Sequence, residues 1–188
     1  MYLISNQKYL MKTVEVLGII ENYLIFFVCF FMNKNFRGIW FYGLAGSGKT
    51  FASHIIQEKN KNSFLIDGDE IRKHVSFDLG YTFQDRLVQL ERLIGLARIT
   101  LNNNFFPVCS SVLMTYKTLI ECKNEKIEVV KIERSYEELK KVRSIYEIEK
   151  NVVGNDLRQE TINTPSIYND GTKNFKSLVV HYVFKKHT

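Results

Sequence analysis

Cysteine and proline are scarce in this chain of 188 residues, which has three cysteines and two prolines. Cys29, Cys109 and Cys122 are scattered and form neither a C-x-x-C pair nor an even-numbered framework. A disulfide scaffold and a zinc site are therefore not expected, and a reducing, cytoplasmic setting is the default prediction. With 45% hydrophobic residues and little glycine, the composition also argues against a disordered or collagen-like chain.

A strong excess of one charge is also missing, since the formal net charge is +6 at pH 7. The charged segments around residues 121–126 and 133–141 mix both signs, which is typical of a solvated surface. We therefore expect no nucleic-acid partner, whereas a mild positive charge suits a small anionic ligand. The length favours one domain with a substantial core.

No hydrophobic run has the length of a membrane span. Residues 23–32 are ten consecutive apolar residues, but a transmembrane helix needs about 20. Phe30-Phe31-Met32 is a poor cleavage site for a signal peptide, and Met32 begins a segment typical of a chain start. We predict that residues 1–31 are a dispensable extension and that 32–188 form the functional domain. A packed helix or a membrane anchor over residues 1–31 are the alternatives.

Hydrophobic patterns after residue 37 alternate between strands and helices. We predict strands at residues 38–42, 64–66, 105–109, 127–132 and 167–168, with Pro107 near the start of its strand. Helices are predicted at 49–59, 85–101, 136–146 and from 174 onward; the apolar residues of 85–101 recur at three- and four-residue steps. The alternation predicts an α/β domain with a mostly parallel sheet.

A glycine-rich segment, Gly43-Leu44-Ala45-Gly46-Ser47-Gly48-Lys49-Thr50, joins the first strand to the first helix. It matches the phosphate-binding loop (P-loop) pattern, in which glycines let backbone amides wrap a phosphate at a helix N-terminus. We predict that this segment binds ATP. Lys49 would neutralise the β- and γ-phosphates, and the Thr50 hydroxyl would ligate Mg²⁺.

Two other classes of P-loop protein lack their motifs here. No N-K-x-D base reader follows the P-loop, as a GTPase switch would require, and the third strand ends in Cys109-Ser110-Ser111 without the acidic residue of a motor ATPase. A small kinase with the three-layer P-loop fold remains. Asp67-Gly68-Asp69-Glu70-Ile71-Arg72 follows the second strand, so Asp69 is a candidate to accept a proton from an attacking hydroxyl. Alternatively, Asp69 simply N-caps the next helix.

The P-loop, the D-G-D-x-x-R segment and Asp78-Leu-Gly-Tyr-Thr-Phe-Gln-Asp-Arg86 together resemble the adenylylsulfate (APS) kinase family over about residues 37–112. The resemblance implies transfer of the ATP γ-phosphate to the ribose 3′-hydroxyl of a nucleotide-type acceptor, and it is compatible with a homodimer. It implies that Asp69 is the catalytic base beside Lys49. The acceptor contacts that it implies are Arg72, Tyr81, Arg86, Gln89, Val112 and Lys150.

The chain departs from the family mainly on the acceptor side and in the lid. Residues 112–116 replace the family's I-S-P-[YF]-R, and residues 142–146 are a shortened form of its R-D-x-K-G-L-Y lid. Val152 and Val153 stand where the family has a stacking phenylalanine and a threonine. Arg143 or Lys150 are the candidates to supply the missing lid cation, which stabilises phosphoryl charge.

These departures leave the acceptor open. It is APS or a related compound, and the segment Asn151-Val-Val-Gly154 resembles kinases of surface-polysaccharide loci that act on CDP-linked phosphoramidate. Two alternatives come from other classes: a nucleotide-binding protein that no longer catalyses, and a P-loop kinase for an antibiotic or a sugar.

Overall fold

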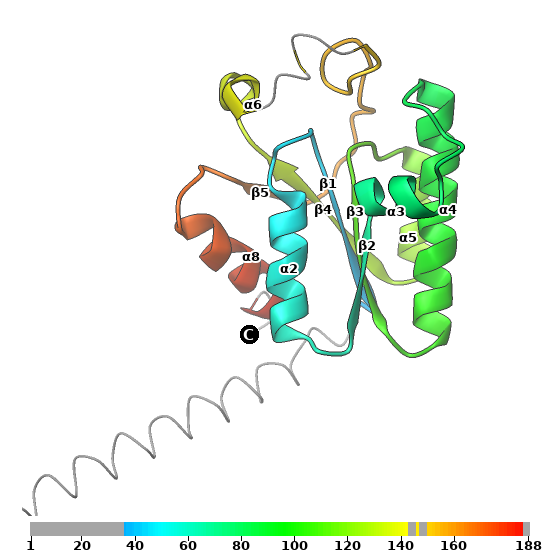
Figure 1. The fold of residues 1–188 in the computed structure, drawn as a ribbon. Helices are drawn as coiled ribbons and strands as arrows, with labels where there is room; N and C mark the ends of the chain where they lie inside the picture. The colour runs from blue at the N-terminus through cyan, green and yellow to red at the C-terminus, as the bar shows by residue number, and fades with distance from the viewer. Residues whose placement is uncertain (1–35, 143–145, 147–149, 186–188) are drawn as a thin grey trace, which may run out of the picture.

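A computed structural model describes residues 36–142, 146 and 150–185 (Figure 1). The predicted extension at residues 1–31 and the lid candidate Arg143 lie outside the described residues. Within the described part of the chain, no helix is long and apolar enough to cross a membrane.

Five parallel strands form one sheet in the order β2-β3-β1-β4-β5. The strands are β1 (Gly38–Tyr42), β2 (Ser63–Asp67), β3 (Phe106–Ser111), β4 (Ile127–Glu133) and β5 (Ser166–Tyr168). The helices are α2 (Lys49–Lys59), α3 (Gly68–His74), α4 (Phe83–Asn102), α5 (Tyr116–Asn124), α6 (Tyr136–Val142) and α8 (Asn174–Lys185). The predicted α/β class and parallel sheet are confirmed.

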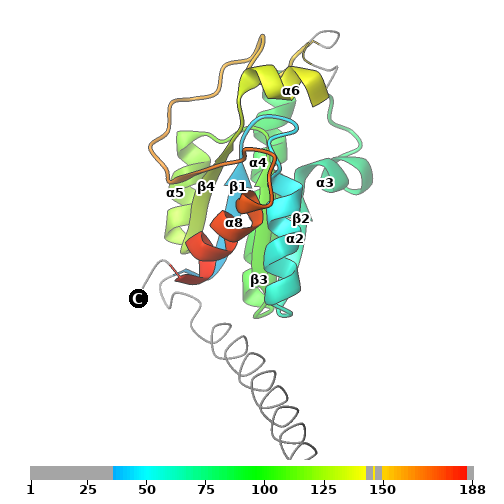
Figure 2. The same ribbon diagram turned by 90° about the vertical axis from the view of Figure 1, so that its left-hand side faces the viewer.

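Helices cover both faces of the sheet and make three layers (Figures 1 and 2). Helices α2 and α8 pack on one face, where Phe41 and Ile132 of the sheet join the core. Helices α4 and α5 pack on the other face around Trp40. Because both faces are covered, strand β1 is buried along its whole length, which explains its continuous apolar run.

Proline 107 is the second residue of β3, near the strand start as predicted. Its ring fits beside β1 only because residue 38 is glycine, since a Cβ at Gly38 would lie 2.6 Å from Pro107 Cγ. This pair of residues explains how a central strand of the sheet accommodates a proline.

Some helices differ from the prediction. Helix α3 lies outside the predicted helix ranges, although the capping alternative for Asp69 assumed a helix there. Helix α5 was not predicted, because its sequence looks like a charged surface run; yet Leu119 and Cys122 are buried against the sheet, and Thr115 caps its start. Helix α4 begins at Phe83, two residues earlier than predicted, because Thr82 and Asp85 form a capping box.

Candidate active site

The P-loop connects the carboxyl end of β1 to α2, and three of its glycines adopt positive φ angles. Gly43, Gly46 and Gly48 have φ angles of 146°, 84° and 106°, which side-chain-bearing residues rarely adopt. The space is also restricted, since a Cβ at Gly43 would lie 2.3 Å from the Ile132 carbonyl oxygen. Gly48 is the N-cap of α2, with no side-chain cap and no acidic residue in the first turn. No acidic residue of the first turn and no capping side chain therefore competes with a phosphate for the N-terminus of α2.

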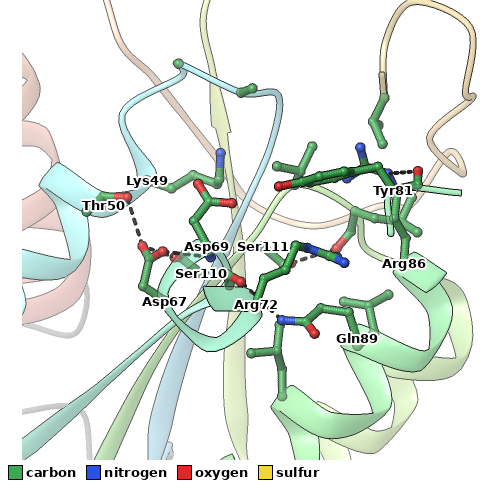
Figure 3. Close-up of a pocket in the computed structure, with 18 of the residues that line it drawn as sticks. Lys49, Thr50, Asp67, Asp69, Arg72, Tyr81, Arg86, Gln89, Ser110 and Ser111 are labelled. Atoms are coloured by element: carbon green, nitrogen blue, oxygen red, sulfur yellow. Dashed lines mark hydrogen bonds between the residues drawn. The ribbon is translucent and has the colours of Figure 1, made fainter. Parts of the chain in front are cut away.

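Three strand ends and the P-loop meet at one edge of the sheet. The Thr50 hydroxyl donates to Asp67 Oδ2 at 2.9 Å, and the Ser110 hydroxyl donates to the same oxygen at 2.8 Å. Asp67 ends β2 and is paired with Ser110 of β3 in the sheet register. Lys49 is largely buried and donates to the Leu44 carbonyl oxygen at 2.9 Å, which holds it against the P-loop (Figure 3).

Asp67, and not Asp69, is the N-cap of helix α3. The Asp67 carboxylate accepts from the backbone amides of Asp69 at 3.0 Å and Glu70 at 3.4 Å. The alternative that Asp69 serves as the cap is therefore wrong. The Asp69 side chain is exposed, lines the cavity beside Lys49 and accepts no hydrogen bond from the described residues (Figure 3). Its carboxylate is available for chemistry.

The hydrogen bonds around Asp67 outweigh its burial. Burial by itself would raise the pKa of Asp67, but hydrogen bonds from Ser110, Thr50 and the Asp69 and Glu70 amides hold it below the ordinary value of 3.8. Asp67 is therefore an anion at neutral pH. Sequence reasoning did not choose Asp67 as a site residue, although its place in the D-G-D segment at the end of a strand was a usable signal.

The other predicted site residues gather in the same cavity, of about 540 Å³. It is lined by Lys49, Thr50, Asp69, Arg72, Tyr81, Arg86, Gln89, Val112 and Lys150, among other residues. Of the P-loop, Ala45, Gly46 and Gly48 also line it, whereas Gly43, Leu44 and Ser47 do not. Figure 3 shows Thr50 and Asp67 at one end and Tyr81 and Arg86 at the other. The cavity thus has a P-loop end and an opposite end, at Tyr81.

Two arginines surround Tyr81 at the second end. The guanidinium carbons of Arg72 and Arg86 lie 4.8 and 5.5 Å from the centre of the Tyr81 ring. Burial and the nearby Arg72 lower the pKa of Arg86, but an arginine remains charged at neutral pH. Together they place two positive charges near an aromatic ring that is 56% exposed. Such a wall suits an anionic group attached to a planar one.

The arginines also hold the loops that carry this wall. Arg72 donates to the Gly80 carbonyl oxygen, and Arg86 donates to the carbonyl oxygens of Tyr81 at 3.2 Å and Asn151 at 2.7 Å. Gln89 donates to the Gly68 carbonyl oxygen at 3.1 Å, which ties α4 to the turn before Asp69. The Tyr81 end of the cavity is therefore braced by the same residues that line it.

Tyr146, the last residue of the lid segment, and the turn at residues 150–156 contact the P-loop. The Tyr146 hydroxyl donates to the Ala45 carbonyl oxygen at 2.8 Å, and Val152 packs with Tyr146 and Leu139 in a small core. The Asp156 carboxylate accepts from the amides of Asn151 and Val152, both at 2.6 Å, and stabilises the turn. Val152 and Val153, in place of the family's aromatic and threonine, line the cavity with aliphatic surface.

The donor set suits a magnesium ion bound together with phosphates. No group of three or more His, Cys, Asp or Glu side chains that could hold a metal occurs in the described part of the chain. Thr50 and Asp67 instead offer one hydroxyl and one carboxylate. Mg²⁺ typically takes one or two such protein ligands and completes its shell with water and substrate phosphates.

The P-loop, the parallel sheet and the cavity that the P-loop lines define a P-loop protein of nucleotide-kinase architecture. A family model described as adenylylsulphate kinase matches residues 36–149, which is more than half of the chain. The chain belongs to the adenylylsulfate kinase family, as the sequence motifs predicted.

Curated relatives match over part of their length. An adenylyl-sulfate kinase of Halothermothrix orenii is 33% identical over 85 residues, covering 42% of this chain and 46% of that protein. An adenylyl-sulfate kinase of Pseudomonas aeruginosa is 31% identical over 78 residues, covering 39% and 40%. The matched stretches thus span less than half of these relatives.

Solved structures show the same fold at low identity. The Mycobacterium tuberculosis APS kinase in complex with AMPPNP and APS has a TM-score of 0.67 at 18% identity, covering 79% of this chain and 96% of that chain. A sugar kinase from Janibacter has a TM-score of 0.56 at 13% identity, covering 78% and 92%. The fold is therefore shared by kinases with different acceptors and does not by itself select one.

Proposed function

We propose that this protein is a Mg²⁺-ATP-dependent kinase that transfers the γ-phosphate to the ribose 3′-hydroxyl of a nucleotide-type acceptor such as APS. One observation carries the proposal: one cavity joins the P-loop to Asp69, which is exposed and caps no helix, and to the Arg72–Tyr81–Arg86 wall. Membership of the adenylylsulfate kinase family supports it.

The residues have separable roles in this reaction. The P-loop amides and Lys49 hold the phosphates of ATP, and Thr50 with Asp67 would hold Mg²⁺, which adds positive charge at the transferred group. Asp69 accepts the proton of the attacking hydroxyl. Arg72 and Arg86 bind the anionic part of the acceptor, so that positioning and charge neutralisation supply most of the rate.

A second acceptor is favoured by the aliphatic side of the cavity. Val152 and Val153 line it where the family has a stacking phenylalanine and a threonine, so a base is stacked by Tyr81 without an aromatic partner from this segment. A CDP-linked acceptor, such as a CDP-linked phosphoramidate, presents a smaller base than APS. It is the alternative to compare directly with APS.

The test is ADP release measured with ATP alone, with APS and with CDP-linked acceptors. Lys49→Ala should abolish turnover. Asp69→Asn should reduce turnover by about 10²–10⁴-fold and leave ATP affinity unchanged, because only the proton acceptor is lost. Glu70→Gln is the matched control: Glu70 is the next carboxylate in the same turn, pairs with Lys73 at 3.0 Å and should stay near wild type.

Three results would contradict the proposal. Full activity of Lys49→Ala would exclude the P-loop as the ATP site, and full activity of Asp69→Asn would exclude Asp69 as the base. ATP binding without acceptor-dependent turnover for every nucleotide acceptor would identify a non-catalytic nucleotide-binding protein. Turnover only with a sugar or an antibiotic would move the protein to another kinase class.

A further inference from the structure

Phe51 is an exposed aromatic residue in the wall of the cavity that the predicted site residues do not include. It directly follows Thr50 in the first turn of α2, and 53% of its surface is exposed. It lines the same cavity as Lys49 and Thr50. Further along this helix, His54, Gln57 and Glu58 are exposed and polar, so Phe51 is not part of an apolar outer surface of α2.

Phe51 is held in place by a buried ring behind it. Phe175 of α8 is 2% exposed, and the two ring centres lie 6.1 Å apart with the planes inclined by 26°. Phe175 is itself fixed against the P-loop, because a Cβ at Gly48 would lie 3.2 Å from its ring. The Asn169 side chain donates to the Ser47 carbonyl oxygen at 2.7 Å and completes this support. Phe51 is therefore a supported platform with an accessible surface.

The polarity of the cavity shows which substrate can reach this platform. If the γ-phosphate of ATP faces Asp69, the rest of ATP extends away from Tyr81 and Arg86. Figure 3 shows Thr50 at the end of the cavity far from Tyr81 and Arg86, and Phe51 follows Thr50. Its neighbour Phe175 belongs to α8, on the opposite side of the sheet from α4, which carries Arg86 (Figure 1). Phe51 is thus on the donor side.

We propose that Phe51 is a stacking platform for the base of the phosphate donor, backed by Phe175. This inference rests on the proposed function, because it takes ATP as the donor. Base–aromatic stacking tolerates any base, since every base has a π-face. Phe51 should therefore strengthen binding of ATP and GTP alike, while Lys49 and the P-loop bind the phosphates.

The experiment compares two probes, ATP and inorganic tripolyphosphate, which has the phosphates but no nucleoside. Dissociation constants are measured by calorimetry in the presence of Mg²⁺. Phe51→Ala should weaken ATP binding about tenfold or more, which corresponds to about 1.4 kcal/mol. It should change tripolyphosphate binding by less than about twofold, because the P-loop contacts remain. Phe51→Tyr should keep ATP affinity near wild type.

Phe64→Ala is the matched control, since Phe64 lies on edge strand β2, is 54% exposed and does not line the cavity. It should leave both dissociation constants unchanged. A second readout is Phe51→Trp, whose fluorescence should change on adding ATP but not on adding tripolyphosphate. The natural tryptophan, Trp40, is fully buried in the core on the α4 side of the sheet and gives a constant background.

Three results would overturn the inference. Equal weakening of ATP and tripolyphosphate in Phe51→Ala would show that the ring only supports the P-loop. Unchanged ATP binding would show that the base lies elsewhere. Equal affinity of the wild-type protein for ATP and tripolyphosphate would likewise show that no base is stacked. A failure of the proposed function looks different, because the wild-type protein would then bind neither ATP nor tripolyphosphate or would bind ATP without transferring its phosphate to any acceptor.

Discussion

Replacing Asp67 tests whether one carboxylate joins the P-loop, strand β3 and helix α3. In Asp67→Ala, helix α3 loses its N-cap, a change that costs about 0.5–2 kcal/mol. The Ser110 hydroxyl, only 3% exposed, loses its acceptor, and a buried unsatisfied donor costs about 1–3 kcal/mol. The Thr50 hydroxyl is exposed and regains water at little cost. We expect Asp67→Ala to lower the free energy of unfolding by about 3 kcal/mol.

The assay is urea unfolding followed by far-UV circular dichroism, with the dependence on urea checked for an unchanged slope. Asp67→Asn keeps an oxygen for the Asp69 and Glu70 amides, and should cost about 1 kcal/mol. In the double variant Asp67→Ala/Ser110→Ala, the two losses of stability should fall short of additivity by about 1 kcal/mol, since each substitution removes the same hydrogen bond. A loss below about 0.5 kcal/mol in Asp67→Ala, or additive effects, would refute this reasoning.

Three further predictions use the same region. Because the folded pKa of Asp67 is depressed, its stabilisation is fully present above the ordinary value of 3.8 and is lost as the pH falls through the lower folded pKa. In urea unfolding, the stabilities of wild type and Asp67→Asn should therefore converge as the pH falls below 3.8, and a constant difference would contradict this. Gly48→Ala should lower the free energy of unfolding by about 1–3 kcal/mol and weaken tripolyphosphate binding, because φ is +106° and its Cβ would lie 2.4 Å from Asn169 Nδ2. A melting temperature and a dissociation constant equal to those of the wild type would contradict this. Arg86→Met should speed amide hydrogen exchange in residues 151–157 by about tenfold, because the hydrogen bond to the Asn151 carbonyl oxygen is lost. Unchanged exchange would show that this hydrogen bond does not stabilise the turn.

Some features of this protein are encoded by a few neighbouring residues, and others depend on packing between distant segments. The P-loop was readable because glycines, a lysine and a threonine at fixed spacing have few other uses between a strand and a helix. Helix α5 was not readable, because its exposed face mixes Tyr116 and Ile120 with lysines. The apolar pattern of the sequence therefore does not single out Leu119 and Cys122 as the buried face. Its start depends on Thr115, a cap that a linear sequence does not distinguish from any other threonine.

The Tyr81 end of the cavity shows the same division. Arg72, Tyr81 and Arg86 were predicted through a family pattern, and the structure brings them together because α3, the following loop and α4 pack side by side. Gln89 and Val112 join the same cavity from α4 and from the end of β3. Phe51 was not predicted as a site residue, because a phenylalanine in the first turn of a helix normally indicates a buried core position. Only the structure shows that about half of its surface is exposed.

The sequence by itself determined the P-loop, the alternation of strands and helices, and the family. These follow from short-range chemistry: backbone freedom at glycine, the period of apolar residues and the order of motifs. Only the tertiary structure decided which carboxylate serves which purpose. Asp67 and Asp69 are two residues apart and both line the cavity, yet the Asp67 carboxylate accepts hydrogen bonds from Thr50, Ser110 and the α3 amides, whereas that of Asp69 accepts none from the described residues. The reason is physical, since the register of β2 beside β3 places Asp67 opposite Ser110, and nothing in the order of residues specifies that neighbour.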